Sequence, residues 1–184
     1  MKTFLLSNLM VIWFLPVIGQ TSDWDEYTPR PAGYLSLRND LNHEDYLLGM
    51  ELGMVNAKRN IVGFVTFDAR PYRKKILEYQ GNNLFYQWRE ERFFIGAGAE
   101  YFKGFERVPL AGFVQLNGVY TWGRYAGTES RPDNGWEIVP RIGVALDLKG
   151  YGWLKMGYSY LDARSYRLSK HHLYLAITGF LTGD

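Results

Sequence analysis

The chain has 184 residues with no Cys, 21 Lys and Arg, 19 Asp and Glu, and a formal net charge of +2. This length allows one domain, the absence of Cys excludes a disulfide framework and thiolate metal sites, and the near-neutral charge argues against a nucleic-acid-binding protein. The mean hydropathy of −0.25 excludes a helical membrane bundle, although 17% of the residues are aromatic and 20 are Gly.

Residues 1–19 are predicted to be a secretory signal peptide that is removed on export. Lys2 is the only charged residue before Asp23, and an almost wholly apolar stretch follows it. That stretch has about 16 residues, whereas a membrane-spanning helix needs roughly 20. Export with cleavage after Gly19 is therefore favoured over an N-terminal membrane anchor.

The mature chain shows alternating apolar and polar runs separated by turn residues, with no apolar period of 3.6 residues. An irregular lead-in at 20–31 precedes one domain that we expect to span 32–184. The eight runs that we expect to be strands cover residues 33–39, 46–55, 61–72, 84–102, 110–125, 136–147, 151–161 and 171–181. The charged segment 88–92 could instead be a turn, which would give nine strands.

The connections between these runs alternate between short and long. The short ones are 56–60, 103–108 and 148–150, and the mostly longer and more polar ones are 40–45, 73–83, 126–135 and 162–170. A barrel with tight turns at one end and longer loops at the other predicts this order. The order and an even strand count both favour a single long strand over 84–102.

Side chains within each run separate into an apolar set and a polar set, because successive residues of a strand point to opposite faces. The apolar set contains no charged residue. The polar set holds many of the glycines and the residues that we expect to form an interior charge network, namely Arg38, Glu51, Asp68, Arg70, Arg92, Glu100, Glu137, Arg141 and Lys155.

Alternation alone does not decide which set faces inward, and a soluble lipocalin-like barrel that binds an apolar ligand would enclose the apolar set. Two observations favour an apolar exterior. Of the seven Lys in the mature chain only Lys155 falls within an expected strand, whereas Arg, which pairs bidentately with carboxylates, is frequent on the polar face. Five cations and four anions on that face nearly cancel, and buried charges must be paired.

Six aromatic residues share the parity of the apolar set and lie toward strand ends, where membrane barrels carry interfacial girdles. They are Tyr101, Tyr120, Trp122, Trp136, Tyr158 and Tyr160. Pro140 is a misfit, because it stands in the middle of a run and lacks a donor for the ladder. We expect a bulge or a local distortion there.

This organisation resembles the small eight-stranded outer-membrane barrels of OmpA or OmpX type over residues 33–181. The last run, HHLYLAITGFLTGD, resembles the C-terminal assembly signal of such barrels, although residues 181–184 follow Phe180 where the family usually ends on Phe. The aromatic-rich composition is also similar to that of Bacteroidota envelope proteins. The resemblance implies a bacterial outer-membrane location, a periplasmic C-terminus and contacts with outer-membrane lipid.

An eight-stranded barrel encloses an interior just wide enough for side chains, so a charged lumen argues against bulk solute transport. We therefore expect a non-enzymatic outer-membrane protein that is structural or an accessory subunit of a larger envelope complex. It would act through loops and protein partners, with candidate contact regions at 23–27, 73–83 and 126–135.

The alternative is a lipid-modifying enzyme, similar to the lipid A palmitoyltransferase and deacylase families. Its catalytic candidates would be His171, His172 and Ser169, with Ser165 and Asp162 nearby, because a His activates a Ser nucleophile only within hydrogen-bond reach. No family motif accompanies them. Three His and no Cys give no metal-ligand spacing, and no phosphate-binding loop is present, so neither a metal nor a cofactor is expected.

Overall fold

The computed structural model of the protein describes residues 32–43, 46–56, 58, 60–70, 74–80, 84–105, 108–126, 133–162 and 169–181. These residues form nine β-strands, and no helix among them is long and apolar enough to cross a membrane. The strands are β1 (Ala32–Leu41), β2 (Tyr46–Val55), β3 (Ile61–Ala69), β4 (Lys74–Gln80), β5 (Leu84–Gly104), β6 (Leu110–Ala126), β7 (Gly135–Asp147), β8 (Gly152–Tyr160) and β9 (His171–Leu181). The predicted signal peptide at 1–19 and lead-in at 20–31 lie outside the described residues.

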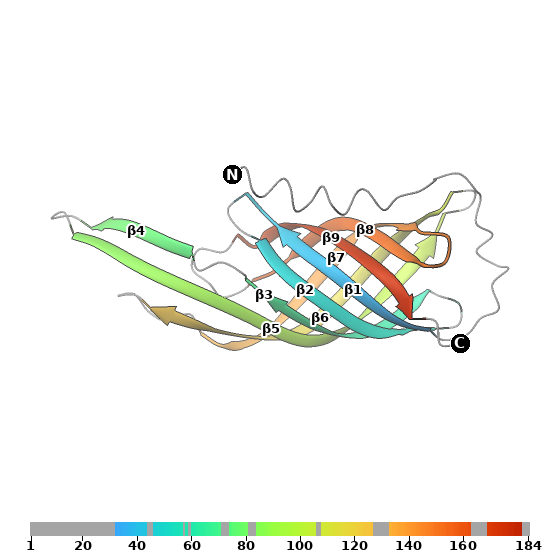
Figure 1. Cartoon of the computed structure of the whole chain (residues 1–184), viewed down its shortest axis with the longest axis horizontal. Coiled ribbons are helices and arrows are strands. Elements are labelled where there is room, and N and C mark those ends of the chain that lie inside the picture. The colour runs from blue at the N-terminus through green and yellow to red at the C-terminus, as the bar shows by residue number, and fades with distance from the viewer. Residues whose placement is uncertain are drawn as a thin grey trace.

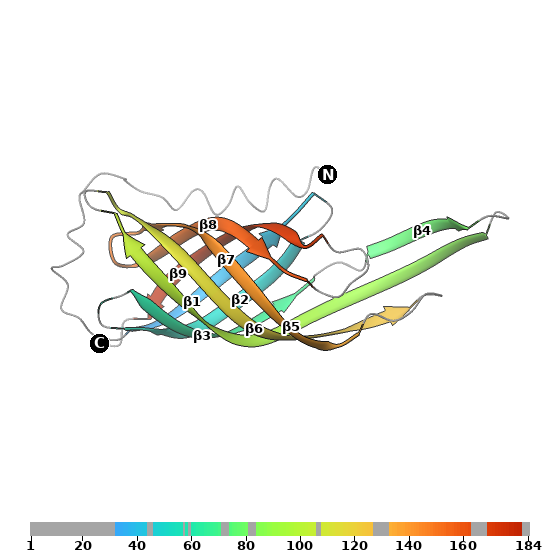
Figure 2. The same ribbon diagram turned by 180° about the vertical axis from the view of Figure 1, so that it is seen from behind.

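Eight of the strands close into an antiparallel barrel (Figures 1 and 2). Their order around the barrel is β3, β2, β1, β9, β8, β7, β6 and β5, and pairing of β3 with β5 completes the ring. The prediction of an all-β, eight-stranded antiparallel barrel is confirmed. Closure pairs each barrel strand on both sides, so the ring itself has no open edge.

The two ends of the barrel differ in their connections. At the end that we call the turn end, β1 begins beside the end of β9, and short turns join β2 to β3, β5 to β6 and β7 to β8. At the opposite end, called the loop end, β1 is joined to β2 and longer connections precede β5, β7 and β9. This alternation is the one that the sequence predicted.

A hairpin made by β4 and the first part of β5 projects beyond the loop end, to the left in Figure 1. Residues 84–90 of β5 pair with β4, whereas residues 93–101 pair with β3 in the barrel wall. The segment 88–92 is therefore part of a continuous 21-residue strand and not a turn. The prediction that 73–83 is entirely a loop is wrong, because residues 74–80 form β4.

Pro140 ends a ladder and does not create a bulge. The register of β7 with β6 runs through Pro140 without interruption, since Pro140 lies opposite Leu116. The pairing of β7 with β8 begins only at Arg141, opposite Ser159. Pro has no backbone N–H to donate, so the expected distortion takes the form of an early end to the β7–β8 ladder at the loop end.

The apolar set faces outward and the charged set faces inward. Met54, Trp136 and Ile138 are each more than 60% exposed, whereas Arg38, Glu51 and Lys155 are almost completely buried. This arrangement is the opposite of a lipocalin-like barrel with an apolar lumen. The outward-facing side chains of the strands thus form a hydrophobic belt around the outside of the barrel.

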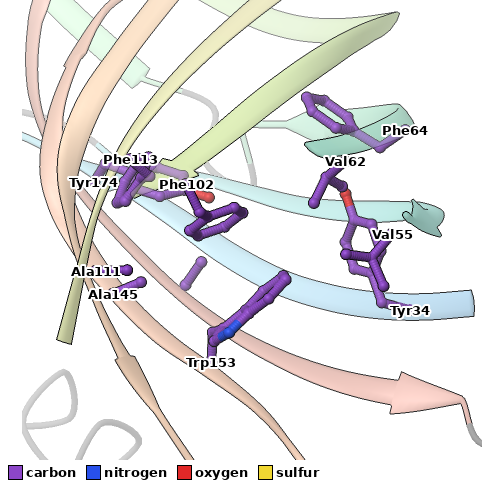
Figure 3. Close-up of a cluster of buried hydrophobic side chains, with 11 residues drawn as sticks. Tyr34, Val55, Val62, Phe64, Phe102, Ala111, Phe113, Ala145, Trp153 and Tyr174 are labelled. Carbon is purple, nitrogen blue, oxygen red and sulfur yellow. The ribbon is translucent and has the colours of Figure 1, made fainter. Parts of the chain in front are cut away.

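The interior is layered and not polar throughout. A cluster of buried apolar and aromatic side chains, centred on Phe102, Phe113 and Trp153, lies toward the turn end (Figure 3). A second, smaller apolar cluster lies toward the loop end and comprises Leu47, Phe94, Val119, Val139 and Leu161. The charged residues between the two clusters are therefore separated from water by apolar side chains on both sides.

Candidate functional site

Arg38 of β1 is the centre of the charged layer. Its guanidinium forms ion pairs with Glu51 of β2 and Asp68 of β3, and it also donates a hydrogen bond to the hydroxyl of Thr66. The Nε atom of Arg38 lies 2.7 Å from Oδ1 of Asp68. Gln115 of β6 donates from Nε2 to Oε1 of Glu51 at 2.8 Å, which extends the network across the lumen.

Gly49 provides the space that the Arg38–Asp68 pair occupies. A Cβ atom at this position would overlap Oδ1 of Asp68 and would lie only 2.6 Å from Nε of Arg38. The inward-facing glycine is therefore required by the ion pair and not by backbone conformation.

The Gly49→Ala substitution should lower the free energy of unfolding by about 1–3 kcal/mol, the usual cost of overpacking a filled interior. Gly63→Ala on β3 is the matched control, because an added Cβ there meets no atom within 4 Å. We expect the control to change stability by less than about 0.5 kcal/mol. Urea unfolding of the two purified variants measures the difference, and equal effects would contradict this role of Gly49.

Arg141 of β7 makes a further interior ion pair, with Asp40 of β1. Nη2 of Arg141 lies 3.0 Å from Oδ2 of Asp40, and Nε lies 3.4 Å from Oδ1. The guanidinium also stacks over the ring of Tyr174, 5.1 Å from its centroid. Because β8 and β9 separate β7 from β1 in the wall, this pair spans the lumen.

Lys155 of β8 also forms an interior ion pair and is enclosed by aromatic rings. Its Nζ atom lies 2.6 Å from Oε2 of Glu100 on β5, and both side chains are fully buried. Four ring centroids lie between 5.2 and 5.9 Å from Nζ, those of Tyr34, Phe102, Phe113 and Trp153. Cation–π attraction in a desolvated site offsets part of the cost of burying this ammonium group.

A further charged group lies at the loop end. Nε of Arg92 is 2.9 Å from Oε1 of Glu90, and Nη1 of Arg70 is 3.8 Å from Oε2 of the same carboxylate. Arg92 also donates to the carbonyl oxygen of Asp133 at 3.3 and 3.4 Å, which connects β5 to the segment before β7. These contacts extend the interior polarity toward the base of the projecting hairpin.

The structure places eight of the nine predicted network residues in the interior, while Glu137 is only partly buried. Asp40 and Glu90 are buried acidic residues that are not among the predicted network residues. Asp40 shares the parity of Arg38 one residue beyond the predicted run 33–39, and Glu90 shares the parity of Arg92 within the predicted run 84–102, so a consistent period of two finds both. Within the described part of the chain, the buried charged side chains are thus five cations and five anions.

The charged layer fills the lumen. Arg38, Glu51, Gln115 and Lys155 are almost completely buried, so they do not line a continuous aqueous channel. No three His, Asp or Glu side chains of the described ranges gather in a way that could hold a metal ion. The interior is a packed polar core. Only the two rims and the outer surface of the barrel can therefore contact other molecules.

The predicted girdle residues lie mainly at the loop end of the outer face. Tyr120, Trp122 and Trp136 form consecutive ring contacts with centroid distances of 6.2 and 5.6 Å. Tyr158 and Tyr160 both contact the His171 ring, with centroid distances of 5.9 and 5.7 Å. Only Tyr101 lies toward the turn end, so the six residues do not form a single ring.

The candidate catalytic residues do not form a Ser–His pair. The hydroxyl of Ser169 bonds to the backbone of His171, while Nδ1 of His171 lies 2.5 Å from the hydroxyl of Tyr158. Nε2 of His172 lies 3.0 Å from Nδ2 of Asn42, inside the barrel. Ser165 lies outside the described residues.

Asp162 is the partner of a lysine, Lys170. Nζ of Lys170 lies 2.6 Å from Oδ2 of Asp162, and this hydrogen bond raises the pKa of the Lys170 amino group. The hydroxyl that lies against the His171 ring thus belongs to Tyr158, and the Ser169 hydroxyl bonds to backbone atoms of His171.

Neither a protein-family model nor a curated protein matches the chain. Among solved structures, the chain is similar to Ail, the attachment invasion locus protein of Yersinia pestis, in complex with the heparin analogue sucrose octasulfate, at 10% identity and a TM-score of 0.48, covering 82% of this chain and 97% of that one. It is also similar to Neisserial surface protein A (NspA), at 10% identity and a TM-score of 0.48, covering 82% and 96%. Neither similarity supports the Bacteroidota resemblance.

Proposed function

We propose that the protein is an integral β-barrel of a bacterial outer membrane, acting as a structural or accessory subunit and not as an open pore. The observation that carries this proposal is the outward face of the barrel strands. Apart from the residues at the two ends of each strand, this face consists of apolar, aromatic and small residues without Asp, Glu, Lys or Arg. A monomer in water rarely exposes so large a continuous apolar surface.

The height of this apolar face fits a bilayer. On β6 the outward side chains from Leu110 to Trp122 are uncharged, and Arg124 is the next one. Twelve residues rise about 40 Å along a strand, at about 3.3 Å each, which gives a height of about 28 Å for a tilt of about 45°. The hydrocarbon core of a typical bilayer is about 30 Å thick.

The connections support an orientation with the turn end in the periplasm and the loop end outside the cell. Outer-membrane barrels have short periplasmic turns and longer extracellular loops. In this orientation the β4–β5 hairpin projects outward from the cell surface and the C-terminus is periplasmic. Because the lumen is filled, contact with partners through the hairpin is the activity that the architecture supports.

A gentle detergent pull-down with the mature protein tests the accessory role. We expect a stoichiometric protein partner that is lost when residues 74–87 are replaced by a short Gly-Ser link. The control shortens the β6–β7 connection at 127–132 and should retain the partner. Absence of any stoichiometric partner for the intact protein would reject the subunit role, and loss with both variants would place the contact elsewhere.

A second measurement addresses the filled lumen. Purified protein reconstituted in a planar bilayer should give no stable ionic conductance steps, because the charged layer leaves no water-filled path. Regular conductance steps from folded wild-type protein would contradict the interpretation that it is not a pore.

A further inference from the structure

The turn end carries one exposed lysine in or directly beside each of its three turns. Lys58 lies between β2 and β3, Lys103 is at the end of β5, and Lys149 lies between β7 and β8. We propose that this arc of three lysines binds the phosphate groups of anionic glycerophospholipids in the membrane leaflet at the turn end. This inference rests on the membrane location proposed above and adds a ligand class to it.

The three amino groups are available for a ligand. All three side chains are exposed, and none has an ion-pair partner among the described residues. The other two lysines whose side chains the structure describes are both paired, Lys155 with Glu100 and Lys170 with Asp162. Among the lysines whose side chains the structure describes, the unpaired ones therefore all lie at the turn end.

Lys149 occupies a backbone position that does not suit a lysine. Its φ is 54° and that of Gly150 is 80°, and the N–H of Tyr151 donates to the carbonyl of Leu148 at 3.1 Å. Positive φ at both central residues is typical of a type I′ turn, which prefers Asn-Gly or Asp-Gly. A left-handed conformation is unfavourable for a long side chain, so its presence at a surface turn points to a role for its charge.

The three turns form a continuous rim. The N–H of Phe102 donates to the carbonyl of Asn60 at 2.8 Å, which joins the first turn to the end of β5 that leads into the second turn. The N–H of Asp147 donates to the carbonyl of Pro109 at 2.9 Å, which joins the second to the third. The lysines are thus held on a rigid arc and not on independent loops.

Exposed apolar side chains accompany the lysines. Phe105 and Val108 belong to the second turn and are 49% and 43% exposed, and Tyr151 follows Lys149 and is 80% exposed. A lysine beside an exposed aromatic residue suits the membrane interface, where the ring enters the headgroup region and the ammonium group reaches a phosphate. Anionic lipid also attracts cations near the membrane surface.

Native mass spectrometry of the detergent-purified mature protein tests the proposal. The apparent Kd for phosphatidylglycerol and for phosphatidylcholine of matched acyl chains would be measured. We expect at least tenfold preference for phosphatidylglycerol in the wild type, since each lysine near an anionic surface contributes about fivefold. The preference should fall to near unity in the Lys58→Gln, Lys103→Gln, Lys149→Gln triple variant.

Lys149→Asn separates the binding role from a role in the turn. Asn suits the turn better than Lys, so thermal stability should stay unchanged or rise while the preference for phosphatidylglycerol falls. Lys170→Gln, at the loop end, is the matched control and should leave the preference unchanged. Equal preference in the wild type and in the triple variant would overturn the proposal.

Two further outcomes separate this proposal from others. Inorganic phosphate at matched concentration should not displace the lipid, and displacement would identify the ligand as a soluble anion. A mature protein that is monomeric without detergent would overturn the proposed membrane location. A detergent-dependent protein without lipid preference would overturn only the inference about the lysine arc.

Discussion

Replacing Arg38 by Met is expected to lower the free energy of unfolding by about 3–5 kcal/mol, because it leaves buried carboxylates without their cation. Arg38 is the ion-pair partner of both Glu51 and Asp68, and all three side chains are almost completely buried. Met has a similar length to Arg but no charge. The loss of unfolding free energy therefore comes more from the unpaired carboxylates than from a cavity. Urea unfolding in detergent micelles, followed by heat-modifiable gel mobility, provides the measurement.

The matched control removes the charges together. The triple variant Arg38→Met, Glu51→Gln, Asp68→Asn eliminates the buried carboxylates along with the guanidinium, and a buried neutral amide costs less free energy than a buried unpaired carboxylate. We expect the triple variant to recover at least half of the stability that the single variant loses. A triple variant no more stable than Arg38→Met would show that packing, and not charge pairing, explains the loss.

Leu116→Arg should impair folding into lipid vesicles by about 2–4 kcal/mol, the cost of an arginine at the bilayer midplane of a barrel. Leu116 is in the middle of β6, points outward and is 56% exposed. On a surface facing water, the same substitution would change stability by less than about 0.5 kcal/mol. The predicted loss therefore depends on the outward face being in contact with hydrocarbon.

Leu110→Arg on the same strand and the same face is the control for position. Leu110 lies at the turn-end edge of the apolar face, where an arginine costs only about 0–1 kcal/mol. Equilibrium folding of both variants into vesicles gives the comparison. Equal tolerance of the two substitutions would indicate that the apolar face does not cross a bilayer.

Much of the fold could be predicted because side-chain alternation is a local property of a strand. The positions of Arg38, Arg141 and Lys155 on the inward face follow from period two once the strand limits are known. The limits themselves were less reliable. Because the first predicted run ends at residue 39, it excludes Asp40. Glu90 lies inside the predicted run 84–102, in its charged segment 88–92, but it is not assigned to the interior network.

The projecting hairpin was missed for a different reason. Residues 74–80 contain polar and charged residues between two longer runs, which is also typical of a loop. Their strand conformation comes from pairing with residues 84–90 of β5. This pairing between β4 and β5 lies outside the barrel wall. An even number of wall strands therefore does not predict it.

By itself the sequence determined which residues form the wall strands, which side chains share a face, and that short and long connections alternate, since each depends on neighbours in the chain. Only the tertiary structure decided which charges meet. Arg141 reaches Asp40 across 101 residues, and Lys155 reaches Glu100 across 55, in each case between strands that are not adjacent in the wall. Closure of a narrow barrel brings such strands face to face across the lumen. The stagger of the strands then determines the height along the barrel axis at which each cation contacts its carboxylate.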